Sequence, residues 1–511
     1  MKKIKYLEFL FLFILGALTS LSLPPYNYII INFFTLGLFF IYIFQKKNSA
    51  KSQHPFAFGW FFGFGYFLTN LYWITISLTF DENFNFLIPI ALILIPSFLA
   101  LFYGLATYCF FLIKIKKPSS NLFLFSLLFG LVEFLRGNIL TGFPWNLIAY
   151  SFSENLEILQ IISFVGTYGF NILCISFFAS PVILILRENR KEIFVCIFFL
   201  LSPIALYITG SSKIKSFQLS NIINNDYLIR AIGSQIDLER FYGNTNTTAV
   251  INELIEISEP DLETKTIFIW PEGIIPNINQ KEIKEFEFLF DKKFNENHLL
   301  AIGINDFQME KNQKKFYNTF SIYDHKLNLI TEYKKVKLVP FGEFLPLEKI
   351  LSKIGLKSLT NNYHSFSGGE SREILTISEK EFDIKILPLI CYEIIYSGKI
   401  FNDSNFDYII NVSEDGWFGN SIGPYQHFVH SIFRAIESGK YLIRSANNGI
   451  SATINPIGFI EKKIEFGRSG YIDFYETRYF NETIFSKYGN KMFLIIILLY
   501  IFLIFSFNRI S

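Results

Sequence analysis

The sequence predicts an α-helical polytopic membrane domain of about eight spans, joined to an α/β domain outside the membrane. Three observations lead to this fold class. The chain has 511 residues, a length that favours more than one domain. Hydrophobic residues make up 51% of it and charged residues only 18%, a composition untypical of disordered or ordinary soluble chains. The apolar residues are also unevenly distributed, with long apolar runs up to about residue 210 and again after residue 491.

The long apolar runs mark the expected membrane spans, because a helix needs roughly 20 apolar residues to cross a hydrocarbon core of about 30 Å. The runs that we interpret as spans are 6–23, 28–45, 56–78, 86–114, 121–136, 160–186, 192–209 and 491–508. The fifth is short and contains Glu133 and Arg136, which we expect to pair or to line a polar cavity near Trp145. The resulting domains are a transmembrane part over 1–210, an external part over 211–490 and a last transmembrane helix over 491–511.

The polar joints between the runs predict their orientation. Basic residues occur at the N-terminus and in alternate joints: Lys2, Lys3, Lys5, Lys46, Lys47, Lys51, Lys114, Lys116, Lys117, Arg187, Arg190 and Lys191. The intervening joints contain neither Lys nor Arg. The positive-inside rule therefore places the basic joints in the cytoplasm and the external domain on the opposite side. An alternative is that the first run is a cleaved signal peptide, although it lacks a clean small-x-small cleavage site.

Charge and cysteine content exclude several classes of protein. The net charge of +2 gives no reason to expect a nucleic-acid partner, and four cysteines in 511 residues cannot form a disulfide scaffold. Cys109, Cys174 and Cys196 fall in expected spans, where cysteine usually packs as a small apolar residue. Cys391 is the only cysteine of the external domain, so it is either buried and inert or a thiol kept for chemistry.

The external domain alternates short apolar segments with longer polar stretches, a pattern typical of an α/β domain. The expected strands are Tyr227–Ile232, Thr266–Trp270, Leu299–Ile304, Phe316–Tyr323, Ile384–Ile390, Tyr408–Asn411 and Ser451–Ile454. The expected helices are Asn244–Ser258, Lys281–Phe290 and Ile422–Ser438.

Three short motifs stand out as strand ends, where catalytic groups often gather. The first is Trp-Pro-Glu-Gly, which contains Glu272, and the second places Lys335 ahead of Leu-Val-Pro-Phe-Gly-Glu-Phe (338–344). The third is Cys391, followed by Tyr-Glu at the end of an apolar strand. Each residue alone has an ordinary explanation as a solvated turn carboxylate, a surface lysine or a core cysteine. Only their joint order and spacing indicate a catalytic site.

These motifs resemble the Glu-Lys-Cys triad of the nitrilase superfamily. Further motifs that narrow the resemblance are Gly142-Phe143-Pro144-Trp145, Leu338–Phe344, Trp417-Phe418-Gly419, Gly423-Pro424, Gln426-His427, Arg434-Ala435 and Arg444–Ser451. Together with the apolar N-terminal region, they resemble the apolipoprotein N-acyltransferases, inner-membrane enzymes that N-acylate bacterial lipoproteins. The resemblance covers nearly the whole chain. It departs at Glu414-Asp415-Gly416, where the family usually reads Asn-Asp-x before Trp-Phe-Gly.

The resemblance implies a four-layer α-β-β-α sandwich on the periplasmic side of a bacterial inner membrane. It implies a Cys391 nucleophile, Glu272 as general base and Lys335 as the cation that stabilises the oxyanion. A phospholipid would donate the acyl chain, and the N-terminal amine of a diacylglyceryl-cysteine in an apolipoprotein would accept it through a Cys391 thioester. This reaction is the final step of lipoprotein maturation. It needs no cofactor, and nothing in the sequence demands more than a monomer.

Several neighbouring residues receive supporting roles. Glu343 is expected to hold the lysine ammonium, to assist proton transfer or to form a structural salt bridge. Tyr392 is expected to offer its backbone N–H to the oxyanion, with Glu393 as a further supporting group. Trp417 and Phe418 either line or gate an acyl pocket or simply pack in the core.

Two further features complete the predictions. The stretch 344–359 is amphipathic, so it is either an interfacial arm over the site or a helix packed on its own domain. His427 and His430 lie three residues apart on an expected helix without a third ligand at suitable spacing, so we expect no metal site.

Two other functions compete with acyl transfer. A membrane-tethered nitrilase-type amidohydrolase of a small amide or nitrile would use the same triad, but it gives no reason for so many spans. A non-catalytic membrane-binding module is disfavoured by the complete triad. An acyl adduct on Cys391 after incubation with phospholipid distinguishes the three.

Overall fold

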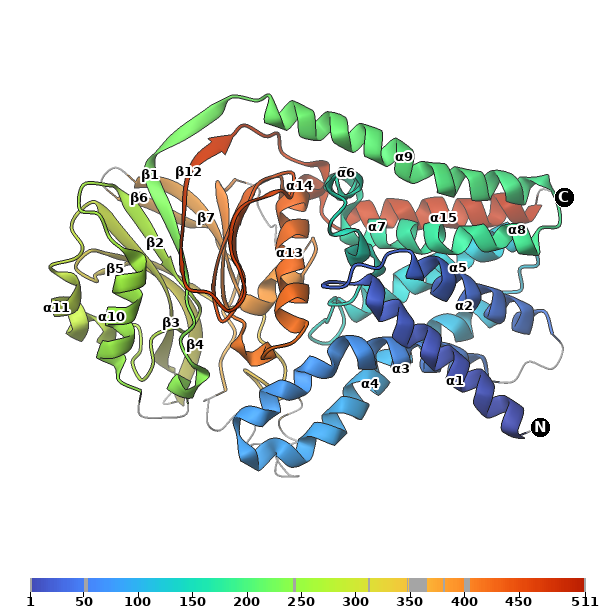
Figure 1. Cartoon of the computed structure of the whole chain (residues 1–511), viewed down its shortest axis with the longest axis horizontal. Helices are drawn as coiled ribbons and strands as arrows, with labels where there is room; N and C mark the ends of the chain where they lie inside the picture. Colours follow the sequence, from blue (N-terminus) through green and yellow to red (C-terminus); the bar gives the residue numbers. More distant parts are fainter. Residues whose placement is uncertain are drawn as a thin grey trace.

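In the computed structural model, the chain forms a helical half and an α/β half (Figure 1). The residues that the structure describes are 2–49, 54–241, 245–310, 313–346, 348, 365–379, 382–398 and 405–509. Both chain ends lie at the end of the helical half that is remote from the sheets (Figure 1). This placement agrees with an even number of crossings.

Long apolar helices build the helical half. They are α1 (Lys2–Thr19), α2 (Ile31–Lys47), α3 (Pro55–Leu71), α4 (Ile88–Leu112), α5 (Pro118–Arg136), α7 (Ile162–Ala179), α9 (Arg190–Gln218) and α15 (Lys491–Arg509). Short helical segments join them: η1 (Ser20–Ser22), η2 (Tyr72–Phe80), η3 (Glu82–Leu87), η4 (Ile148–Phe152), α6 (Leu156–Leu159), η5 (Ser180–Val182) and α8 (Ile183–Leu186). Every predicted span therefore coincides with a helix.

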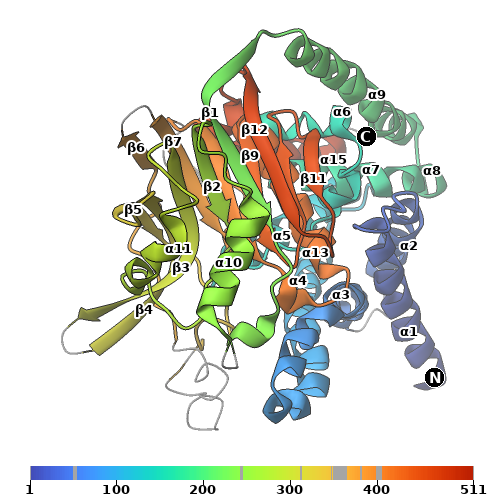
Figure 2. The ribbon, with the colours of Figure 1, turned by 60° about the vertical axis from the view of Figure 1, so that its left-hand side comes forward.

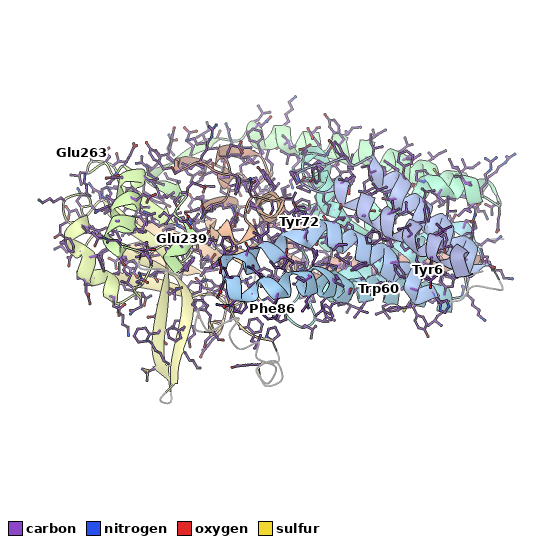
Figure 3. The ribbon with its side chains drawn as sticks, turned by 60° about the horizontal axis from the view of Figure 1, so that its bottom comes forward. Tyr6, Trp60, Tyr72, Phe86, Glu239 and Glu263 are labelled. Atoms are coloured by element: carbon purple, nitrogen blue, oxygen red, sulfur yellow. The ribbon has the colours of Figure 1, made fainter. Side chains whose placement is uncertain are left out.

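The outer surface of the helical half is apolar. Within the described residues, six helical segments are long and apolar enough to cross a membrane, while α1 and α2 are shorter. Figure 3 shows Tyr6, Trp60, Tyr72 and Phe86 along this half, and Tyr6 and Phe86 are 72% and 66% exposed. So many exposed apolar side chains are stable only in lipid, so this is a membrane protein.

Some predicted spans differ in their details from the helices. The α-helix of the third span ends at Leu71 and continues as the tighter η2, and η3 precedes α4 in the fourth. The seventh helix, α9, continues to Gln218, past its predicted end at 209. Its last turns are polar and carry Lys213 and Lys215, so they extend the helix beyond the apolar run. Glu133 and Arg136 form a buried ion pair in α5. This confirms the pairing that was one of the two roles predicted for them.

The α/β half contains two six-stranded sheets, ordered β12-β1-β2-β3-β4-β5 and β11-β10-β9-β8-β7-β6. The strands of the first sheet are β1 (Ile222–Gly233), β2 (Thr266–Trp270), β3 (His298–Glu310), β4 (Gln313–Asp324), β5 (Leu329–Lys334) and β12 (Gly470–Arg478). Those of the second are β6 (Leu375–Glu379), β7 (Phe382–Ile390), β8 (Tyr408–Glu414), β9 (Tyr441–Asn447), β10 (Ser451–Ile454) and β11 (Ile460–Ile464). In each sheet, three neighbouring strands run parallel: β1, β2 and β3 in one, and β7, β8 and β9 in the other.

Helices cover the outer face of each sheet, and the sheets face each other (Figures 1 and 2). The helical segments of this half are η6 (Leu238–Phe241), α10 (Thr247–Ser258), η7 (Glu282–Phe286), α11 (Glu287–Phe290), η10 (Cys391–Ile395), η11 (Gly416–Phe418), α13 (Gly423–Ser438) and α14 (Ile484–Tyr488). α10 and α11 cover the first sheet, whereas α13 lies between the second sheet and the helical half. The predicted four-layer α-β-β-α sandwich is confirmed.

The two faces of β2 show how the sequence builds these layers. Side chains alternate along a strand, so Ile267 and Ile269 join the core between the sheets while Phe268 and Trp270 join the core under α10. All of these side chains are buried. The strand is therefore apolar at every position.

The secondary-structure predictions for this half were incomplete. Each predicted strand lies in an observed one, but β5, β6, β9, β11 and β12 were not predicted. The predicted helix Lys281–Phe290 was wrong as a single element, because Phe286 adopts φ −98° and ψ 9° between the short η7 and α11. Most of the amphipathic stretch 344–359 lies outside the described residues.

Candidate active site

Glu272 lies just after β2, where Pro271 ends the strand. The neighbouring Gly303 of β3 lets the two backbones approach closely: a Cβ there would lie 2.5 Å from Glu272 Cα and 2.3 Å from Pro271 O. Only glycine fits such a contact. The packing of the sheet thus fixes the backbone of Glu272, whose side chain is buried.

Lys335 follows β5, and its buried ammonium contacts two carboxylates. Its Nζ donates to Glu272 Oε1 at 2.9 Å and to Glu343 Oε1 at 2.8 Å. Asn318 of β4 donates from Nδ2 to the same two oxygens, at 2.7 and 3.0 Å. Burial alone would lower the pKa of Lys335, but Glu272 and Glu343 outweigh it and raise the pKa well above its usual range. The lysine is therefore a fixed cation.

Cys391 is the first residue of η10, directly after β7, and has a strained backbone conformation with φ at +49°. Residues other than glycine rarely adopt such angles, and strain of this kind gathers at functional sites. The thiol is buried and interacts electrostatically with both Glu272 and Lys335. Burial, followed by the charge of Glu272, raises the pKa of Cys391 well above its usual range, while Lys335 opposes the rise. The thiol thus needs a base to ionise.

Glu393 joins the lysine segment to the cysteine strand. Its fully buried carboxylate accepts hydrogen bonds from Tyr333 Oη (2.8 Å), Arg372 (3.0 Å) and the backbone N–H groups of Val336 (3.1 Å), Lys337 (3.1 Å) and Ile390 (3.0 Å). Two of these donors directly follow Lys335 and one directly precedes Cys391. The single carboxylate therefore sets the distance between the ammonium and the sulfur.

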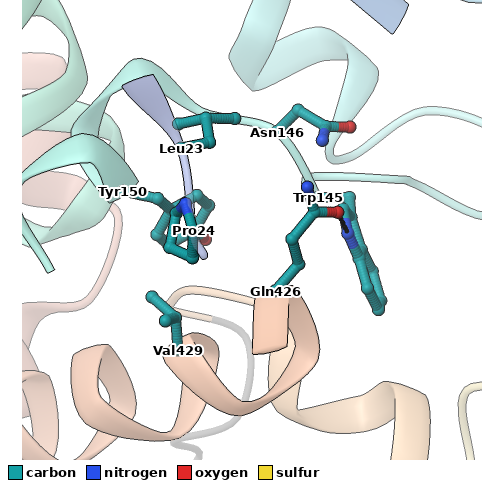
Figure 4. A pocket seen from close by; sticks show the side chains of 7 residues that line it. All are labelled: Leu23, Pro24, Trp145, Asn146, Tyr150, Gln426 and Val429. Carbon is teal, nitrogen blue, oxygen red and sulfur yellow. Dashed lines mark hydrogen bonds between the residues drawn. The ribbon is translucent and has the colours of Figure 1, made fainter. Parts of the chain in front are cut away.

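The loop after α5 closes the back of the site. Tyr392 Oη donates to the Gly142 carbonyl at 2.8 Å, and the Trp145 ring stacks on His427 of α13 at 5.4 Å. Trp145 also donates to Gln426 at 2.8 Å, as Figure 4 shows beside a small pocket between the two halves. The residues lining this pocket are Leu23, Pro24, Trp145, Asn146, Tyr150, Gln426 and Val429. The helical half is thus packed directly against the elements that carry the thiol.

Trp417 and Phe418 lie on η11, in contact with aromatic rings from other elements. Phe418 packs edge-on against Trp73 and His427, at 4.8 and 5.4 Å. Trp417 stacks on Phe241 at 5.5 Å and is partly exposed. These contacts place Phe418 in the wall between the halves, while Trp417 lies at the surface of the same wall.

Sequence reasoning missed two groups at this site. Asn318 was not singled out, although it bonds both carboxylates that hold Lys335. A second group lies behind Cys391: Asp415 pairs with Arg444 at 2.7 Å and with His427 Nδ1 at 2.9 Å, and His427 Nε2 lies 3.3 Å from the Cys391 carbonyl oxygen. The motifs that contain these residues served only to identify the family, and a motif does not reveal which residues contact each other in the fold.

The comparisons with known proteins agree with this architecture. A family model described as the apolipoprotein N-acyltransferase N-terminal domain matches residues 15–180, and one described as carbon-nitrogen hydrolase matches 264–472. A Rickettsia prowazekii protein named apolipoprotein N-acyltransferase is 35% identical over 494 residues, which cover 93% of this chain and 94% of that protein. The chain belongs to the apolipoprotein N-acyltransferase family. A Rhodopseudomonas palustris protein of the same name is 32% identical over 475 residues, covering 90% of this chain and 87% of its own length.

Solved structures similar to this chain include Saccharomyces cerevisiae Nit3, of the nitrilase superfamily, with 15% identity and a TM-score of 0.35. That match covers 48% of this chain and 89% of Nit3. An amidase from Nesterenkonia sp. AN1, with a covalent adduct at its active-site cysteine, has 13% identity and a TM-score of 0.34, covering 51% of this chain and 93% of the amidase.

Membership of the apolipoprotein N-acyltransferase family confirms the predicted enzyme class. The first family model falls on the helical half and the second on the α/β half. The protein is therefore an acyltransferase that combines a membrane part with a nitrilase-like α/β domain.

Proposed function

We propose that this protein transfers an acyl chain from a membrane phospholipid to the N-terminal amine of a diacylglyceryl-cysteine in apolipoproteins. The observation that carries the proposal is a strained, buried thiol, Cys391, that shares one charge network with Glu272 and Lys335. The large apolar helical half supports a lipid donor, because both proposed substrates keep their acyl chains in the bilayer.

In the first half-reaction, the Cys391 sulfur attacks the carbonyl carbon of the phospholipid ester. Glu272 accepts the thiol proton, which the raised pKa of the thiol makes necessary. Lys335 stabilises the negative charge that develops on the carbonyl oxygen. The carbon–oxygen ester bond then breaks, the proton passes from Glu272 to the departing alkoxide, and a lysophospholipid leaves. Cys391 is left as a thioester.

In the second half-reaction, the free amine of the apolipoprotein attacks the thioester carbon. Glu272 accepts a proton from the amine, the carbon–sulfur bond breaks, and the proton passes from Glu272 to the departing sulfur. The amide product leaves with the Cys391 thiol and the Glu272 carboxylate restored. Water would compete for the thioester, so the site has to exclude it. The packing of the Trp145 loop against α13 supports such exclusion behind the sulfur.

The contacts around the site also support roles for the neighbouring residues. Glu343 bonds the Lys335 ammonium at 2.8 Å, so we assign it to holding that cation. Tyr392, the first residue of η10 after the nucleophile, supplies a backbone N–H for the oxyanion. Phe418 contributes to the wall of the site that faces the helical half, and Trp417 lies at the surface edge of that wall.

For its location, we propose a bacterial inner membrane with the α/β half in the periplasm. The basic joints of the helical half, such as Lys46 and Lys47 at the end of α2, occur on the side opposite to the α/β half. The positive-inside rule assigns that side to the cytoplasm.

The test is intact-mass analysis of the full-length protein after incubation with phospholipid vesicles. We expect one added acyl chain on Cys391 that is discharged by a diacylglyceryl-cysteine peptide and persists in buffer alone. A Cys391→Ser variant is expected to lose turnover by several orders of magnitude, because a hydroxyl is a poor nucleophile. An adduct that water discharges equally fast would favour a hydrolase, and no adduct at all would refute acyl transfer.

A further inference from the structure

Glu414, the last residue of β8, contacts the general base through its backbone. Its N–H donates to Glu272 Oε2 at 2.9 Å, whereas Lys335 and Asn318 occupy Oε1. The position of the end of β8 therefore determines the orientation of the Glu272 carboxylate. Any group that fixes Glu414 also acts on Glu272.

The side chain of Glu414 forms a completely buried ion pair. Arg240, from the η6 segment after β1, donates to Glu414 Oε2 while both side chains are at most 2% exposed. Asn447 donates to the same oxygen at 2.7 Å, and the Gly416 N–H donates to Oε1 at 2.8 Å. Both oxygens of the Glu414 carboxylate thus accept hydrogen bonds. If the carboxylate moved, a buried charge would be left unpaired.

The other partner is held equally firmly. Arg240 NH1 donates to the backbone carbonyls of Ile236 and Asp237, at 3.1 and 3.0 Å. Arg240 therefore connects the loop after β1, in the first sheet, to the end of β8, in the second. Glu272 lies at the end of β2, which neighbours β1, so the pair joins the two sheets beside the base.

An amide side chain at position 414 would need no cation in the interior, whereas the Glu414 carboxylate does. A buried carboxylate without a partner is strongly destabilising. The Arg240 guanidinium compensates the charge that Glu414 introduces, and the pair is neutral as a whole.

We propose that the Arg240–Glu414 ion pair is a positioning device for Glu272: it fixes the Glu414 N–H on Glu272 Oε2 and keeps the surroundings of the base electrically neutral. This inference deepens the proposed function, since it rests on that proposal for the role of Glu272 as base.

The test uses the pH dependence of Cys391 alkylation by iodoacetamide in the full-length protein, with no lipid substrate. Glu414→Gln leaves the Arg240 guanidinium uncompensated behind Glu272. That charge offsets the Glu272 charge that raises the pKa of the thiol, so we expect the midpoint to fall by about one pH unit. We also expect acyl-adduct formation on Cys391 to slow at least tenfold. The double variant R240M/E414N, which removes both charges, is expected to regain the wild-type midpoint and a rate within about threefold.

The matched control is Arg230→Met, which breaks an ion pair between β1 and β12 away from the site, and its midpoint is expected to remain that of the wild type. A folded Glu414→Gln variant with the wild-type midpoint, or a double variant that fails to recover it, would overturn the proposal. If Glu414→Gln does not fold, Arg240→Lys is tested instead. This variant keeps the positive charge, so the alkylation midpoint is expected to stay that of the wild type while acyl-adduct formation slows. An acylation rate equal to that of the wild type would overturn the proposal.

Alkylation also separates this inference from the proposed function. A shifted midpoint without an acyl adduct from any phospholipid would refute acyl transfer alone. An acyl adduct in a Glu414→Gln variant whose midpoint has not moved would refute the positioning role alone.

Discussion

The most demanding prediction concerns Glu393→Gln, an isosteric change at the carboxylate that joins the lysine segment to the cysteine strand. The carboxylate accepts from five donors. A glutamine side chain offers one oxygen and one NH₂ group, so its NH₂ must face at least one N–H or O–H donor. The variant keeps the shape of the side chain and removes the charge and half of its accepting capacity.

The expected cost follows from these contacts. One lost charge-assisted hydrogen bond costs about 1.5–3 kcal/mol, and removing the charge opposite buried Arg372 brings the total to about 3–5 kcal/mol. The same loss frees the backbone next to Lys335 and Cys391. A displacement of about 1 Å between reacting groups costs on the order of 10² in rate, so we expect acylation of Cys391 to slow at least ~100-fold.

The assay is the rate of acyl-adduct formation on Cys391, followed by intact mass in phospholipid vesicles. Glu373→Gln is the matched control, because that carboxylate is exposed, lies in the neighbouring chain segment and bonds Ser371 instead. The control is expected to react at the wild-type rate. A Glu393→Gln variant that acylates within threefold of the wild type would show that the carboxylate does not set the geometry of the site.

Three further predictions follow from the same contacts. Glu272→Gln is expected to abolish acylation and yet lower the pH midpoint for alkylation of Cys391, because the Glu272 charge raises the pKa of that thiol; an unchanged or higher midpoint contradicts this. Burial holds the pKa of His430 well below its usual 6.5, so the unfolded chain binds the extra proton and the thermal unfolding midpoint should fall as the pH drops below about 6.5. His430→Asn should weaken that dependence, and an equally steep fall contradicts the assignment. Gln426→Leu removes the acceptor of two buried indole N–H groups and is expected to destabilise the protein by about 2–4 kcal/mol, measured as a lower unfolding midpoint than that of the wild type.

Two positions of the candidate site were predictable because they follow the ends of expected strands. Glu272 and Cys391 each terminate an apolar segment whose burial is visible from its composition. Asn318 could not be found in this way, because it lies in the middle of β4 and contacts residues 46 and 25 positions away in the chain. A single asparagine in a strand has no local sign of such partners.

The missed strand β9 shows the same limit. All seven of its residues are buried, yet Arg444 and Asn447 interrupt the apolar run that would reveal a buried strand. Their polar groups are satisfied by Asp415 and Glu414, which come from the end of the neighbouring strand β8. Polar residues in the interior become predictable only once their partners are known, and those partners are supplied by the tertiary fold.

The hydroxyl groups behind the nucleophile have a practical consequence for enzyme engineering. Tyr392 and Tyr396 donate to carbonyl oxygens of residues 141 and 142, in a loop of the helical half. A water-soluble fragment cut after α9 would lose these acceptors and expose the face of α13 that the Trp145 loop now covers. Miniaturising the enzyme therefore requires retaining that loop, grafted or supplied as a separate peptide, because the scaffold of the reactive sulfur is completed by a segment far upstream in the chain.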